Sequence, residues 1–201
     1  MIRAPRLPEP EDFDSRARRP GTAWLADHPG AKRPKALWSA YTPVLEAGYR
    51  KLCGYAAMAD FTGGTVDHYL SFKNHRAQAY EWSNYRFASA TMNSCKRDAD
   101  DAVLDPEEVQ AGWFEIVLPS LQLRLTDQIP ARLRDKAAYT LRRLRLDDGE
   151  RVIRWRQSWY QLYTEGLLDL EGLREVAPLI AQAVEGSRPA SGVARAARLQ
   201  R

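Results

Sequence analysis

The residues of this chain that could do chemistry together are Asp67, His68, Asn84, Asn93 and Lys96. Asp67 and His68 follow a β-branched, strand-like pair, and Asn93 opens an Asn-x-x-Lys sequence. A neutral imidazole with a pKa near 6.5 can take a proton from water at physiological pH. A carboxylate and an amide oxygen suit a hard divalent cation and leave positions open for phosphate and water. The pattern therefore predicts hydrolysis of a phosphodiester bond.

The residue types suggest a role for each position. His68 is the candidate general base, and Asp67 and Asn93 are candidate ligands of one divalent metal ion, most simply Mg²⁺ or Mn²⁺. Asn84 is grouped with His68 as a catalytic residue because its amide can bond backbone groups across the loop and orient the imidazole. Lys96, one helical turn beyond Asn93, could reach a phosphate, as could Arg86.

Each of these residues also has an ordinary structural alternative. Asn84 follows Ser83 and could be a turn residue, Asn93 could be a helix N-cap, and Lys96 could be a surface lysine. The interpretation depends on the joint pattern, because a strand-borne Asp-His pair, a hairpin return and Asn-x-x-Lys at a helix start rarely coincide.

Longer stretches extend the pattern: Cys53-Gly-Tyr-Ala-Ala-Met, Gly64-Thr-Val-Asp-His-Tyr-Leu-Ser-Phe-Lys and Tyr80-Glu-Trp-Ser-Asn-Tyr-Arg-Phe-Ala. Together with the nine-residue spacing from Asn84 to Asn93, they resemble the HNH (ββα-metal) endonuclease family in its H-N-N variant. They are similar to HNH proteins of Septu-type and retron-type antiphage defence systems. The resemblance implies metal-dependent cleavage of DNA to 5′-phosphate and 3′-hydroxyl ends, and a partner protein such as an ATPase.

The cysteines depart from the pattern of many such proteins, which pin the hairpin with zinc held by two Cys-x-x-Cys pairs. Only Cys53 is kept here, and the other three positions are Ala56, Ser89 and Met92. Cys95 is out of register, so a four-thiolate zinc site is lost and we expect no structural zinc. We expect apolar packing to hold the hairpin instead, through Met58, Phe61, Phe87 and Met92.

The elements that must position these residues follow from periodicity and breakers. Strand-like alternation covers residues 65–70 and the pair within 112–126, hinged at Pro119-Ser120. Helical spacing predicts helices over about 37–52, 92–102, 130–146, 149–165 and 168–185. In the first of these, Pro43 either interrupts the helix or marks its true first turn.

The fold class that this indicates is α+β, with a ββα-metal core between an N-terminal helix and a C-terminal helical region that includes a short β-hairpin. Residues 1–22 read as an extended Pro- and charge-rich arm outside the core. Residues 23–110 form the nuclease core with its preceding helix, 111–186 the hairpin and helical region, and 187–201 a basic, flexible tail.

The charge balance is compatible with a nucleic-acid partner. The 201 residues carry a net charge of +4 with 44% hydrophobic residues, enough for a folded core. Arginines gather in the C-terminal helices, and Arg142 and Arg143 are candidate nucleic-acid contacts. The alternative is a solvated helix face paired with Asp135, Asp147, Asp148 and Glu150, and the sequence favours neither.

The start of the chain is rich in Pro and acids, with no apolar leader, and no run of about 18 apolar residues follows, so we expect a cytoplasmic protein with reduced thiols and no membrane contact. Two rivals to a DNA endonuclease stay open. One is a ribonuclease that uses the same site, because the proposed chemistry does not use the 2′-hydroxyl. The other is a catalytically inactive HNH scaffold that binds nucleic acid or protein.

Overall fold

The C-terminal helices form where apolar residues recur every three or four positions. In the computed structural model, which describes residues 1–187, α4 covers Ala131–Leu144 and α5 covers Glu150–Thr164, in agreement with the predicted ranges. The third predicted helix is two helices, α6 (Leu170–Val176) and α7 (Pro178–Ser187). Pro178 divides them because its ring disfavours helical backbone at Ala177 and its nitrogen cannot donate a hydrogen bond.

Two antiparallel strand pairs interrupt the helices, so the class is α+β as predicted. β3 (Phe114–Val117) pairs with β4 (Gln122–Leu125), on the two sides of the predicted hinge. β1 (Thr65–His68) pairs with β2 (Tyr85–Ala88), and α3 (Ala90–Lys96) follows directly. Ser89 is the N-cap of α3, and its Oγ accepts a hydrogen bond from Met92 N. The helix begins two residues before the predicted residue 92 and ends well before the predicted residue 102.

The N-terminal region is more helical than predicted. A π-helical turn (Asp14–Arg18) leads into α1 (Arg19–Asp27), which the sequence analysis did not predict. A 3₁₀ turn (Leu37–Tyr41) leads into α2 (Thr42–Gly48), with Pro43 in the first turn of α2. Further 3₁₀ turns are Arg76–Gln78, Trp82–Asn84 and Asp100–Ala102.

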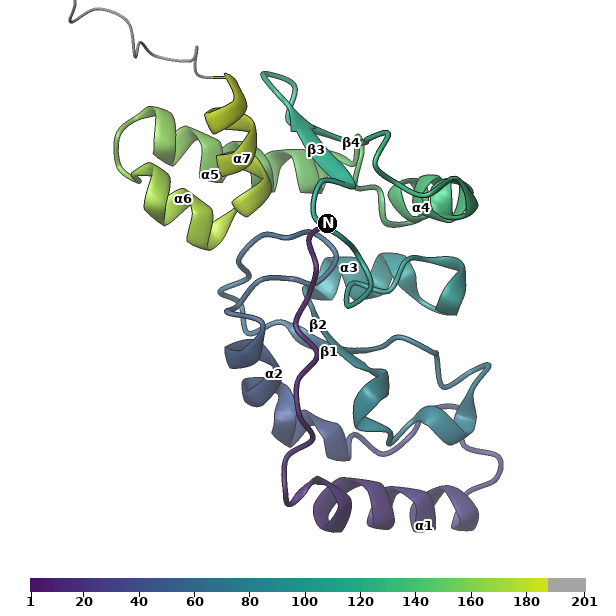
Figure 1. Ribbon diagram of the computed structural model, residues 1–201. Helices are drawn as coiled ribbons and strands as arrows, with labels where there is room; N and C mark the ends of the chain where they lie inside the picture. Colours follow the sequence, from purple (N-terminus) through teal and green to yellow (C-terminus); the bar gives the residue numbers. More distant parts are fainter. Residues whose placement is uncertain (188–201) are drawn as a thin grey trace, which may run out of the picture.

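The prediction that residues 1–22 form an arm outside the core is wrong. The first ten residues are extended, but Met1 and Ala4 are buried, and so are Phe13 and Ala17 beyond them. Figure 1 shows this segment running from between the two halves of the molecule down to α1. The apolar side chains of the arm are few but are placed where they fill both cores, which local composition does not reveal.

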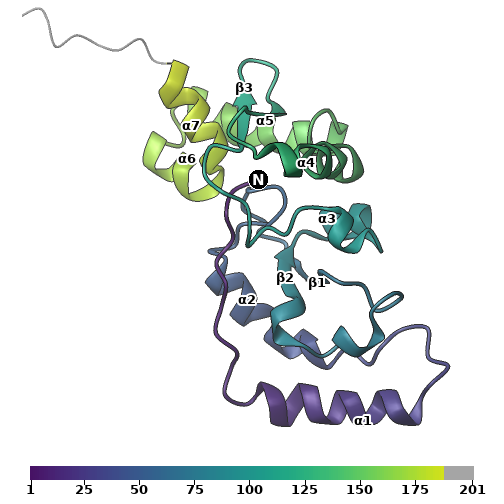
Figure 2. The ribbon, with the colours of Figure 1, turned by 45° about the vertical axis from the view of Figure 1, so that its right-hand side comes forward.

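The core has two clusters, and α3 lies between the halves that contain them (Figure 2). One cluster joins Cys53–Met58 and Met92 to the C-terminal region. The other packs Phe13 against α2, β1 and β2. We expected a boundary near residue 110. The first cluster contains residues from both sides of this position, so no separate core begins there. The expected tail lies outside the described residues except for Ser187.

Candidate functional site

The hairpin of β1 and β2 presents Asp67 and His68 on opposite faces, because neighbouring strand residues alternate. Asp67 pairs with Arg86 across the ladder and His68 with Tyr85. The side chain of Asp67 contacts Tyr55 and Lys96. The ring of His68 instead packs edge-to-face on Trp38 and Tyr85. The two candidate residues therefore have separate surroundings although they are adjacent in sequence.

His68 has a defined tautomer. Its Nε2 lies 2.9 Å from the carbonyl oxygen of Ala79, and because a carbonyl only accepts, Nε2 carries the proton. The lone pair is then on Nδ1, which forms no hydrogen bond with any described residue. Burial lowers the pKa of His68, and this effect exceeds the opposing effects of the Ala79 hydrogen bond and Asp67. The imidazole is thus neutral at physiological pH, as a general base must be.

Asp67 is buried, with only 1% of its surface exposed. One carboxylate oxygen accepts a 2.6 Å hydrogen bond from the Tyr55 hydroxyl, and the other lies 3.2 Å from Lys96 Nζ. Lys96 is fully buried too and also donates to the His68 carbonyl oxygen at 2.8 Å. Burial, followed by the charge of Asp67, raises the pKa of Tyr55 well above its usual range, so this phenol stays a donor. Asp67 and Lys96 therefore form a buried ion pair that ties β1 to α3.

Asn84 links the two ends of the loop between β1 and β2. Its Oδ1 accepts from Leu70 N at 2.7 Å, and its Nδ2 donates to the carbonyl oxygens of Leu70 and Gln78 at 2.9 and 3.0 Å. Gln78 immediately precedes Ala79, the residue that holds His68. Asn84 has the geometry expected of a residue that orients His68 through the backbone, and it does not touch the imidazole directly.

Asn93 holds the first turns of α3 against β1. Its Nδ2 donates to Thr65 Oγ1 at 3.1 Å and to the Val66 carbonyl oxygen at 3.3 Å. Its Oδ1 accepts no hydrogen bond within residues 1–187, so this oxygen is available to a ligand. The side chain that caps α3 is that of Ser89, which removes the alternative that Asn93 is an N-cap.

These positions do not fit a divalent cation as they are placed. Asn93 offers an oxygen, but both oxygens of Asp67 are engaged, and the Lys96 ammonium beside it would repel a cation. Residues 1–187 also contain no group of three or more His, Cys, Asp or Glu side chains that could hold a metal ion. A cation could use Asp67 only if Lys96 left the carboxylate.

The structure does not support phosphate contacts by Lys96 and Arg86. Lys96 is enclosed by the ion pair just described. Arg86 is buried, and its Nε and Nη2 donate to the two carboxylate oxygens of Asp105, with Glu107 3.2 Å from Nη1. Both cations compensate buried carboxylates, and a buried charge without its partner would be costly. The sequence alone gave no role to Asp105 and Glu107, which the structure places as the partners of Arg86.

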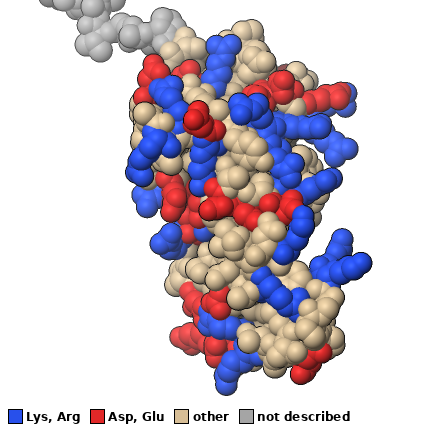
Figure 3. Space-filling model, turned by 90° about the vertical axis from the view of Figure 1, so that its right-hand side faces the viewer, with Lys and Arg blue, Asp and Glu red and all other residues tan. Residues whose placement is uncertain are grey.

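The arginines of the C-terminal helices differ in accessibility. Arg142 is exposed, whereas Arg143 donates to the carbonyl oxygen of Lys96 at the end of α3. Arg134 and Arg154 form ion pairs with Asp127 and Glu150. Figure 3 shows Lys and Arg side chains together with Asp and Glu on the face beside α4. This face is mixed in charge. Arg142 is exposed and stays a candidate nucleic-acid contact, whereas Arg143 holds the end of α3.

The four positions compared with zinc ligands lie together. Cys53 Sγ accepts a hydrogen bond from Ser89 N, and Cys53, Ala56 and Met92 share one buried cluster. Both cysteines are free thiols, and burial raises the pKa of Cys53. Met58, Phe87 and Met92 are buried as expected, but Phe61 is 61% exposed and does not hold the hairpin.

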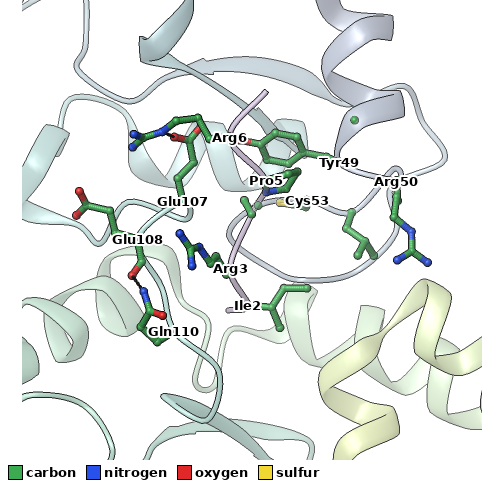
Figure 4. A pocket seen from close by; sticks show the side chains of 14 residues that line it. Ile2, Arg3, Pro5, Arg6, Tyr49, Arg50, Cys53, Glu107, Glu108 and Gln110 are labelled. Atoms are coloured by element: carbon green, nitrogen blue, oxygen red, sulfur yellow. Dashed lines mark hydrogen bonds and ion pairs between the residues drawn. The ribbon is translucent and has the colours of Figure 1, made fainter. Parts of the chain in front are cut away.

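Two residues that sequence reasoning missed complete the surroundings of the site. Tyr55 holds Asp67, and Trp38 packs on His68 with 4.5 Å between ring centroids. Tyr55 lies in the stretch Cys53–Met58 but was given no role, and Trp38 lies outside every motif. Long-range folding brings both to the Asp-His pair. The cavity in Figure 4, about 600 Å³, lies elsewhere, between the N-terminal arm, Tyr49–Gly54 and Glu107–Gln110, and none of the candidate residues lines it.

Comparison with known proteins gives no assignment. No protein-family model, curated protein or solved structure matches the chain significantly. Among residues 1–187, no helix is long and apolar enough to cross a membrane.

Proposed function

We propose that this chain hydrolyses phosphodiester bonds in nucleic acid, with DNA as the preferred substrate. The observation that carries the proposal is the state of His68: a neutral imidazole, fixed by Ala79 through Nε2, with the Nδ1 lone pair unused. It stands on a strand pair followed by a helix that carries Asn93, at the spacing on which the resemblance to HNH nucleases rests.

In the proposed reaction His68 Nδ1 removes a proton from a water molecule. The water oxygen then bonds to phosphorus while the bond to the 3′ oxygen breaks. The departing 3′ oxygen takes a proton from solvent and His68 returns its proton to solvent, which gives a 5′-phosphate and a 3′-hydroxyl. Asn84 has a positioning role, because it holds the loop that contains Ala79. A requirement for Mg²⁺ or Mn²⁺ is proposed on the resemblance alone, since Asp67 does not present a free oxygen.

The cellular setting is proposed on the same resemblance. The protein would act in the cytoplasm as the effector of an antiphage defence system. A partner such as an ATPase would license cleavage. A partner that moved α3 would also move Lys96 away from Asp67, because α3 carries Lys96.

The second candidate is an inactive HNH scaffold that binds nucleic acid or protein. The buried pair of Asp67 and Lys96 favours it, because the carboxylate that should meet a cation is already neutralised. A ribonuclease would use the same residues as the DNA endonuclease, so it differs only in substrate.

The test is a digestion of supercoiled plasmid, single-stranded DNA and total RNA with Mg²⁺, Mn²⁺ or a chelator. Wild type is compared with His68→Ala and with His28→Ala, a matched control in which an exposed histidine stacked on Trp24 is removed. Cleavage that needs metal and His68 but not His28 supports the proposal, and the substrate that is cut separates DNA from RNA. Absence of cleavage by folded wild type under every condition contradicts nuclease activity of the isolated chain, and leaves the scaffold or a nuclease that needs its partner.

A further inference from the structure

A hollow runs between the start of α3 and the side of α5. It consists of two adjoining cavities of about 380 and 540 Å³, which share Ala90 and Thr91 as lining residues. Figures 1 and 2 both place α3 beneath the C-terminal helices. We call this hollow the α3–α5 groove.

One end of the α3–α5 groove is aromatic. Phe61, Trp155 and Trp159 line it, with Phe61 and Trp159 edge-to-face at 5.9 Å between ring centroids. Phe61 is 61% exposed, which is unusual for a large aromatic side chain. The buried Nε1 of Trp159 has no hydrogen-bond partner among the described residues.

The other end is cationic. Arg145 and Arg151 line it, are exposed, and form no ion pair within the described part of the chain. Glu150 lines the same end, but its carboxylate is paired with Arg154. Asp147 and Asp148 line a neighbouring hollow that also includes Arg145. At the aromatic end Lys51 Nζ lies 5.4 Å from the centre of the Phe61 ring.

We infer that the α3–α5 groove binds single-stranded nucleic acid. Unpaired bases can stack on accessible aromatic rings, while Arg and Lys along the same channel pair with the phosphates. Duplex bases are already stacked on one another and cannot use Phe61 in this way. The inference deepens the proposed function by naming a single-stranded substrate. The groove follows α3, the helix that carries Asn93, although Asn93 itself faces β1 and does not line the groove.

The experiment measures binding without cleavage. Fluorescence anisotropy of labelled oligo-dT of about 20 nucleotides, a length that spans one ordinary binding site, is followed with His68→Ala protein in chelator. Competitors are the same length of duplex DNA and poly-glutamate. Phe61→Ala and Arg151→Gln are added to the His68→Ala background. The matched controls are Leu167→Ala, which removes another exposed apolar side chain, and Arg132→Gln, which removes an exposed arginine of α4 outside the groove.

We expect the dissociation constant for oligo-dT to rise at least about fivefold for Phe61→Ala, as for loss of one base–aromatic stack. Arg151→Gln should weaken binding and reduce its salt dependence, and the two controls should leave binding unchanged. Absence of oligo-dT binding, equal loss in the controls, or equal competition by duplex or poly-glutamate would overturn the inference. Binding at the groove by a wild type that cuts nothing would uphold the inference while contradicting nuclease activity of the isolated chain.

Discussion

At the scale of single residues, the pair of Asp67 and Lys96 dominates the candidate site. Both side chains are almost fully buried, and each has a further partner: Tyr55 donates to Asp67, and Lys96 donates to the His68 carbonyl oxygen. Removing one member of a buried ion pair leaves an uncompensated charge and costs about 3–5 kcal/mol. The pair therefore stabilises the contact between β1 and α3 even though it occupies the carboxylate.

A double-mutant cycle tests this pair. Lys96→Met and Asp67→Asn should each lower the free energy of unfolding by about 3–5 kcal/mol, and the double variant should cost less than the sum of the two. Urea denaturation at neutral pH measures all four proteins. The exposed pair of Arg154 and Glu150 serves as the control and should show almost no coupling. Additive losses for Asp67 and Lys96 would show that they do not interact.

His68 predicts a pH dependence of stability. Its pKa in the folded protein is lowered by burial, so the unfolded chain takes up the proton more readily. Stability from neutral His68 is therefore complete above the unfolded pKa of about 6.5 and is lost as the pH falls toward the folded pKa. The difference in unfolding free energy between wild type and His68→Gln should shrink from about pH 8 to about pH 5. A difference that grows on acidification would contradict the lowered pKa.

The same pKa bears on activity. If His68 is the general base, the rate of cleavage should stay constant above the usual histidine pKa, because the imidazole is already neutral there. The acidic limb should lie below about pH 6.5. A rate that rises through pH 7–8 would assign the base to another group.

At the scale of elements, the approach to β1 depends on two neighbouring glycines with different surroundings. Both have positive φ, +92° at Gly63 and +54° at Gly64. A Cβ at Gly64 would lie 2.3 Å from Phe87 Cζ, whereas one at Gly63 would have no described atom within 4 Å. Gly64 is thus required both for its backbone conformation and for the close approach of the Phe87 ring.

Alanine substitutions separate these two requirements. Gly63→Ala should cost about 1–2 kcal/mol of unfolding free energy, from the backbone alone. Gly64→Ala should cost about 1–3 kcal/mol more, because the ring of Phe87 must also move. Urea denaturation of the two variants checks this. Equal losses of unfolding free energy would show that the Phe87 ring moves aside without destabilising the protein.

At the scale of the whole molecule, the N-terminal segment joins the two halves. Met1 belongs to the cluster shared with the C-terminal helices, whereas Ala4 and Phe13 belong to the cluster around β1 and β2. Arg6 forms an ion pair with Glu107, which also pairs with Arg86. The segment thus contributes to the core and to the buried charge network beside the candidate site.

Truncation of Phe13 tests this contribution. Phe13 is fully buried and packs edge-to-face on Tyr41, Trp82 and Tyr85. Phe13→Ala should lower the free energy of unfolding by about 3–5 kcal/mol. Leu167→Ala is the control, because Leu167 is 71% exposed and its loss should change stability by no more than about 0.5 kcal/mol. If the Phe13 variant were as stable as the control, the segment would contribute nothing to the core, as expected of an external arm.

The sequence by itself determined the elements with strong local signals. α4 and α5 agree with their predicted ranges, and β3 and β4 lie on either side of Pro119-Ser120. The order of β1, β2 and α3 also follows from the sequence. It places His68 on a strand pair and Asn93 on the helix that comes directly after it. Periodicity, turns and helix caps act over a few residues, so a linear sequence reveals them.

Only the tertiary structure decided the environment of each candidate residue. Asp67 meets Lys96 across 29 positions, and Arg6 meets Glu107 across 101. His68 receives its fixed tautomer from Ala79 and its ring contact from Trp38. The buried polar groups among these, such as Asp67, Lys96 and Glu107, have no water to bond with, so each needs a partner that the fold places beside it. Residue type and spacing alone do not reveal which residues become these partners.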